Sequence, residues 1–66
     1  MTVKQLIGQL ERLDPEQMVV ANGYEGGYDE ILAAVPIRLK LHAHTDWWYG
    51  KHEQDDNGEC LAIHIK

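Results

Sequence analysis

The chain has 66 residues, of which 44% are hydrophobic and 26% charged, and its formal net charge is −5. This length allows a single small domain, residues 1–66, and excludes a multi-domain enzyme. No apolar run reaches the roughly 20 residues that span a bilayer or the roughly 7 to 15 of a signal peptide's apolar core. A single cysteine, Cys60, excludes a scaffold held by internal disulfides. The sequence therefore predicts a cytoplasmic protein without a membrane partner.

The negative charge is concentrated in two segments. Residues 23–30 contain three acidic residues and no basic one, and residues 42–59 contain five acidic residues and a single lysine. Charge of this sign repels nucleic-acid phosphates and anionic lipids, so direct binding to either is disfavoured. A basic protein surface is the expected partner. The alternative is that the acidic loops only keep a small protein soluble.

The first predicted element is an amphipathic helix over residues 3–13. Thr2 and Gln5 form the T-x-x-Q pattern of a capping box. Apolar residues then recur at spacings of three and four, which places them on one face of a helix. Pro15 disfavours helical backbone angles at Asp14 and so marks the end of the helix.

Strands are predicted at three places. The apolar run 18–21 ends at Asn22-Gly23 and predicts a short strand and a turn, and the glycine-rich segment 23–28 predicts a shaped loop. Apolar and polar residues alternate over 35–41 and again over 61–66, so both segments are expected to turn an aliphatic face to the core. Pro36 lacks an amide hydrogen and should lie near the start of its strand or on a sheet edge. The inward aliphatic residues are expected to be Val35, Ile37, Leu39, Leu41, Leu61, Ile63 and Ile65.

The segment 42–59 is both polar and aromatic. Asn57-Gly58 is a strong signal for a two-residue hairpin turn. If that turn forms, residues near 48–55 pair with the C-terminal strand as a fourth strand. The sequence does not decide between such a hairpin arm and a mobile loop. The predicted fold is α+β, with one N-terminal helix packed on a three- to four-stranded antiparallel sheet.

Histidines raise the possibility of a metal site. His42 and His44 lie two apart at a strand end, about 7 Å along the strand. His64 could be a third zinc ligand, with His52 or Glu53 as a fourth, which gives a metal-binding regulatory domain as one alternative function. Basic side chains at residues 38 and 40 on the same face would repel a dication, so solvated histidines and no cofactor are expected.

Enzymatic activity is not expected. Cys60 and His64 are four residues apart on a strand, about 13 Å, which is outside hydrogen-bond reach for a catalytic dyad. The glycine-rich segment 23–28 has no lysine, serine or threonine after it to hold a phosphate, and its acidic residues would repel one. Nothing in the chain therefore predicts a catalytic residue.

Aromatic residues next to acids predict a protein-binding surface. Adjacent residues of a strand face opposite sides, so at least one of Trp47 and Trp48 should be exposed. Tryptophan and tyrosine are common anchors of small interfaces, although one tryptophan could instead complete the core. The predicted partner-binding residues are Tyr24, Glu25, Tyr28, Asp29, Glu30, Asp46, Trp47, Trp48, Tyr49, Glu53, Asp55, Asp56 and Glu59.

The first half of the chain resembles small proteins of phages and bacterial mobile elements. The resemblance rests on Thr2-Val3-Lys4-x-Leu6-Ile7-x-x-Leu10-x-x-Leu13-x-Pro15, on Val19-Val20 and on Gly23-Tyr24-Glu25-Gly26-Gly27-Tyr28-Asp29. In size and charge the chain is similar to anti-CRISPR proteins, some of which occupy basic DNA-binding surfaces of CRISPR effectors as DNA mimics.

This resemblance implies a phage-encoded inhibitor in the bacterial host cytoplasm, acting as a monomer or weak homodimer on a DNA-binding subunit of a CRISPR effector complex. For mimicry, Glu53 and Asp55 on an extended segment would lie about 7 Å apart, near the phosphate spacing of one strand, and Asp56 could continue the line. The alternative is a structural or oligomerisation module that pairs with its own copy through a sheet face or a strand edge.

Overall fold

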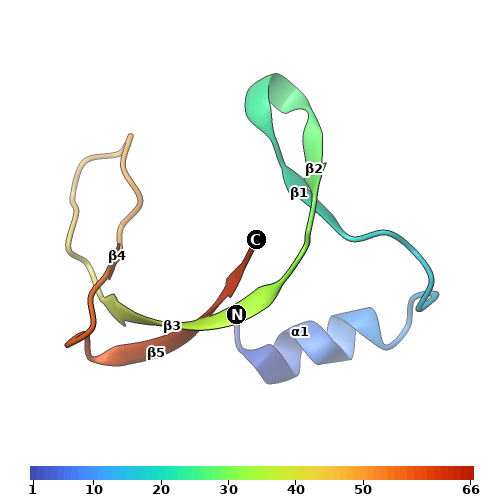
Figure 1. Ribbon diagram of the computed structural model, residues 1–66, viewed down its shortest axis with the longest axis horizontal. Helices are drawn as coiled ribbons and strands as arrows, with labels where there is room; N and C mark the ends of the chain where they lie inside the picture. Colours follow the sequence, from blue (N-terminus) through green and yellow to red (C-terminus); the bar gives the residue numbers. More distant parts are fainter. The chain divides into compact units, whose positions relative to one another are not determined.

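The computed structural model describes residues 1–66 and contains one α-helix and two antiparallel sheets (Figure 1), which confirms the predicted α+β class. The chain divides into two compact units, Met1–Leu32 and Ala33–Lys66. The expectations of one domain and of a helix packed on the sheet stay predictions. No apolar side chain is fully buried. The single α-helix has eight residues, so it is too short to cross a bilayer.

In the first unit, helix α1 spans Val3–Leu10 and begins with the predicted capping box. The backbone N–H of Thr2 donates to Gln5 Oε1 at 2.8 Å, and that of Gln5 donates to Thr2 Oγ1 at 3.1 Å. The helix ends three residues earlier than predicted. The N–H of Leu13 bonds to the carbonyl of Leu10, and the Asp14 carboxylate accepts from the N–H of Glu16 at 2.9 Å. These bonds fold the residues before and after Pro15 into turns.

A hairpin of two short strands completes this unit. Strand β1 (Val20–Asn22) begins two residues later than predicted, and it pairs with β2 (Tyr28–Glu30), which the sequence did not predict. Between them lies the 3-10 turn η1 (Tyr24–Gly26). Glu25 and Gly26 have φ values of 49° and 83°, in the left-handed region. The predicted shaped loop is confirmed, and Gly26 supplies the angle that other residues adopt at a cost.

The second unit is a three-stranded sheet in the order β4-β3-β5. Strands β3 (Ala34–Lys40) and β5 (Cys60–Ile65) confirm the predicted strands at 35–41 and 61–66 to within one residue. Just beyond them, Ala33 and Lys66 exchange two backbone hydrogen bonds, of 2.7 and 2.9 Å. Strand β4 (Glu53–Gln54) pairs with the other edge of β3. The prediction that this segment pairs with the C-terminal strand is therefore wrong.

The reason is that residues 55–59 cross β3 instead of forming a hairpin. Leu39 is the register partner of Gln54 on one edge and of Cys60 on the other. Between these partners the N–H of Asp55 bonds to the carbonyl of Arg38 at 3.0 Å. Gly58 is buried against the backbone of Leu39. The Asn57-Gly58 turn exists, but it carries the chain over the strand.

The register places the two aliphatic stripes on opposite faces of the sheet. Ile37 lies directly opposite Ala62, and opposite residues of antiparallel strands share a face. Ile63 is paired with Pro36 instead, on the face that carries Arg38. The alternation predicted for each strand is right, but the prediction that both stripes face one core is wrong. Both faces of this sheet are partly apolar.

Candidate functional site

The exposed loop that follows β3, residues 41–52, is closed by its own hydrogen bonds; we call it the aromatic loop. The N–H of His44 donates to the carbonyl of Lys51 at 3.0 Å. The N–H of His42, whose φ is 54°, donates to Nδ1 of His52 at 3.0 Å. The N–H of Tyr49 closes a turn at the tip of the loop. The segment is thus joined to β3 through β4, and the predicted hairpin arm, which required pairing with the C-terminal strand, is not formed.

The tip of the aromatic loop carries two exposed tryptophans. Trp47 and Trp48 are 91% and 67% exposed, and their rings meet edge to face with centroids 5.7 Å apart. Tyr49 lies against the ring of His44 at 4.3 Å. The prediction that at least one tryptophan is exposed is confirmed. Neither completes a core, so both rings are accessible to a partner.

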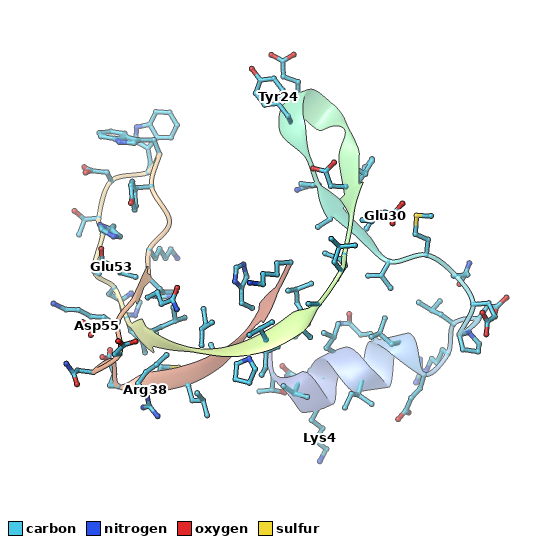
Figure 2. The ribbon with its side chains drawn as sticks, in the orientation of Figure 1. Lys4, Tyr24, Glu30, Arg38, Glu53 and Asp55 are labelled. Carbon is cyan, nitrogen blue, oxygen red and sulfur yellow. The ribbon has the colours of Figure 1, made fainter.

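Three acidic side chains predicted to contact the partner, Glu53, Asp55 and Glu59, have contacts within the chain. Glu53 Oε1 lies 3.7 Å from Nε2 of His44, which has no hydrogen-bond partner. Asp55 Oδ1 accepts from the N–H of Asn57 at 2.9 Å, and Glu59 Oε1 accepts from a backbone N–H of the aromatic loop. Figure 2 shows Glu53, the first residue of β4, and Asp55 near Arg38. These carboxylates stabilise the aromatic loop and residues 55–59, the crossing segment, which passes over β3.

Two acidic residues of this unit are left without such contacts, Asp46 beside Trp47 and Asp56 in the segment 55–59 that crosses β3. The carboxylates of Asp46 and Asp56 accept no hydrogen bond and form no ion pair within the chain. Both residues are exposed. Of the predicted carboxylates in this unit, these two are the ones free to meet a basic partner.

Glu59, the residue before β5, is hydrogen-bonded to the first residue of the aromatic loop. Its carboxylate accepts from the N–H of Leu41 at 2.8 Å. Hydrogen bonds from its own backbone N–H and from that of Leu41, helped by the charge of Lys40, hold the pKa of the Glu59 carboxyl below its usual value. Desolvation and the charge of Asp55 oppose this lowering. The ionised form is therefore favoured when the unit is folded.

We expect this lowered pKa to make the unit acid-sensitive. A carboxyl whose pKa is lower in the folded state stabilises it above the unfolded pKa, and that contribution is lost as the pH falls through the folded pKa. Glu59→Gln keeps an oxygen that can accept from Leu41 but does not titrate. The urea midpoint should fall less between pH 7 and pH 3 in Glu59→Gln than in the wild type. Glu59→Ala, which lacks the acceptor, should be less stable already at pH 7, and identical pH profiles for all three chains would contradict the assignment.

The β1–β2 tip forms a second group of exposed aromatic and acidic residues. Tyr24 and Tyr28 are 88% and 70% exposed, and Figure 2 shows Tyr24 at the end of the hairpin. Glu25 lies in the turn itself, and Glu30 ends β2. Asp29 lies close to Gly23, where an added Cβ would be 2.8 Å from Oδ2. The five residues predicted in this segment therefore share one hairpin.

The residues proposed as zinc ligands do not converge on one point, although the rings of His42 and His52 lie 5.2 Å apart. His64 lies opposite Val35, on the other face of the sheet from Arg38, and His42 leaves the strand with a positive φ. No group of three or more histidine, cysteine or acidic side chains is placed to hold a metal ion. Cys60 is a free thiol whose only polar contact is with the carbonyl of Leu61, at 3.8 Å.

Comparison with known proteins gives no match to a family model, to a curated protein or to a solved structure.

The sequence did not indicate the importance of Gly58 or of the His42–His52 contact, since both depend on residues far apart in the chain. The functional argument rests on the geometry of the aromatic loop and its neighbouring acids.

Proposed function

We propose that this chain is an inhibitory binding protein of the anti-CRISPR kind, which occupies a basic DNA-binding surface of a CRISPR effector complex. The observation that carries the proposal is the exposed Trp47–Trp48 pair on a loop braced by hydrogen bonds. Exposed tryptophans on a defined loop are typical interface anchors. The net charge of −5 favours a basic partner over nucleic acid.

Inhibition would result from occupancy and would need no chemistry. The tryptophan rings would fill apolar recesses on the effector, and Asp46 and Asp56 would meet lysine or arginine side chains that otherwise hold phosphates. The hydrogen bonds of His42 and His44 order the loop before binding, which lowers the entropy lost on association. Long-range attraction would speed association, and the aromatic anchors would slow release.

The test uses purified, guide-loaded effectors of each CRISPR type and a labelled target duplex. We expect the chain to bind one of them and to displace the duplex, with an affinity that falls as salt rises. Asp56→Lys should weaken binding about tenfold. Glu16→Lys, an exposed residue of the other unit, changes the net charge equally and is the matched control. Asp55 is unsuitable for charge reversal because its carboxylate holds the turn.

Two results would contradict this proposal. Equal weakening by Asp56→Lys and Glu16→Lys would mean that net charge alone matters and that Asp56 does not meet a basic side chain of the effector. Binding to none of the effectors, or binding that leaves the duplex in place, would exclude inhibition by occupancy.

A further inference from the structure

Strand β5 has an edge that no strand of the chain pairs with. The sheet order is β4-β3-β5, so β5 is bonded to β3 on one side only. The strand has six residues, and none of them carries a formal charge with histidine neutral. A six-residue edge without charge is open to pairing with another strand.

The hydrogen-bond pattern identifies the backbone groups on that edge. Ala33 and Lys66 exchange both backbone bonds, and hydrogen-bonded and non-bonded pairs alternate along an antiparallel ladder. Ala62 therefore directs its N–H and carbonyl toward β3, as does His64. The backbone groups of Leu61, Ile63 and Ile65 point away from β3. The one contact recorded for them is the long one between Cys60 Sγ and the carbonyl of Leu61.

The same three residues present apolar side chains. Leu61, Ile63 and Ile65 are 66%, 43% and 41% exposed and share one face of the sheet. The other edge of the sheet is the part of β3 that β4 does not cover, and it is less suited to pairing. The pair Pro36–Ile63 is a non-hydrogen-bonded one, so the nitrogen of Pro36 points to that edge. A proline there blocks pairing. β5 has no such protection.

We propose that β5 binds a second copy of this chain, and that the two β5 strands pair antiparallel about a two-fold axis at Ile63. Ile63 is the middle one of the three outward residues, so this register uses all of them. It places Ile63 opposite Ile63, and Leu61 opposite Ile65, of the second copy. Each hydrogen-bonded pair exchanges two bonds, which gives about six between the copies. The two exposed stripes then form one continuous apolar face, and no charged residue of either β5 faces another.

This contact does not depend on the proposed inhibitory function, because it uses none of the acidic or aromatic residues assigned to the partner. An isologous interface needs one self-complementary patch, and β5 supplies that patch with backbone groups and aliphatic side chains alone. The six strands of the two copies would form a single sheet.

The first test is amide hydrogen exchange of the wild-type chain at low and high concentration. The amides of Leu61, Ile63 and Ile65 should gain at least about tenfold protection as concentration rises. Those of Ala62 and His64 bond to β3 and should be protected throughout, so they are internal controls. Unprotected outward amides at millimolar concentration, together with a strictly monomeric mass in sedimentation, would overturn the proposal.

The second test checks the register by oxidative cross-linking in a Cys60→Ser background. Ile63→Cys places two thiols in one pair, with Cα atoms about 5.5 Å apart, within disulfide range. Leu61→Cys, on the same face, places them about 13 Å apart along the strands. We expect rapid cross-linking of Ile63→Cys and little of Leu61→Cys. Equal rates would indicate random collision and would overturn the two-fold axis at Ile63.

Discussion

Replacing Gly58 with alanine should abolish cooperative folding of Ala33–Lys66. Gly58 is the one buried residue of the chain, and a Cβ at this position would overlap the carbonyl group of Leu39 and lie 2.8 Å from the nitrogen of Lys40. Both contacts are with backbone, which cannot move aside without opening the sheet. The carbonyl of Gly58 also accepts from Nη1 of Arg38 at 3.2 Å. We expect a loss of several kcal/mol, which is comparable to the whole stability of a domain of this size.

Urea unfolding followed by tryptophan fluorescence and circular dichroism measures this effect. Gly50→Ala is the matched control, because nothing lies within 4 Å of a Cβ at that position. The control should keep the wild-type midpoint, and Gly58→Ala should show no cooperative transition. A Gly58→Ala chain with the midpoint of the control would mean that residues 55–59 do not cross β3 in contact with it.

Replacing both Trp47 and Trp48 with alanine should remove binding to the partner while leaving the fold intact. Anchors of this kind contribute about 2 kcal/mol or more each, so the loss of both should lower affinity by about 1,000-fold. Both side chains are mostly exposed and contact each other edge to face. Their removal therefore opens no cavity in the unit, and the free energy of unfolding should change by less than about 0.5 kcal/mol.

Titration calorimetry against the effector identified by duplex displacement, together with urea unfolding, measures the two quantities. Leu32→Ala is the control, since Leu32 is 84% exposed and lies outside both aromatic groups. Tyr24→Ala tests whether the β1–β2 tip contributes as well. Wild-type affinity in the double variant would exclude the aromatic loop as the contact surface, whatever the effect of charge.

Local signals predicted the elements correctly where the decisive contacts are local. The capping box of Thr2 and Gln5 needs residues three apart, and both are bonded as expected. The period-two pattern located β3 and β5 to within one residue. The alternation of apolar and polar residues shows which residues of one strand share a face, but it does not show which residues of two strands lie opposite each other. That register is fixed by the pairing of Leu39 with Gln54 on one edge and with Cys60 on the other.

The sequence predicted which residues form the candidate site, but not which of its acidic side chains are bonded within the chain and which are free. The prediction that at least one of Trp47 and Trp48 is exposed is right, although both lie in a turn and not in the strand on which that prediction was based. The sequence could not separate structural carboxylates from free ones. The Glu59 carboxylate is bonded to a backbone N–H 18 residues away. This partner depends on the path of residues 55–59 across β3, which the sequence does not reveal. Asp56 lies within the crossing segment without a partner of its own.

The strand order also affects how the second unit can form while the chain is being synthesised. β3 leaves the ribosome well before β5, which pairs with it along its length, and β4 covers only Leu39 and Lys40 in the meantime. A nascent β3 is therefore an aliphatic strand with both edges largely open, the state in which chains associate wrongly. Pro36 removes one hydrogen-bond donor from one of those edges throughout that interval. We therefore expect Pro36 to limit wrong pairing along that edge during synthesis, at a position where the finished sheet has no hydrogen bond to lose.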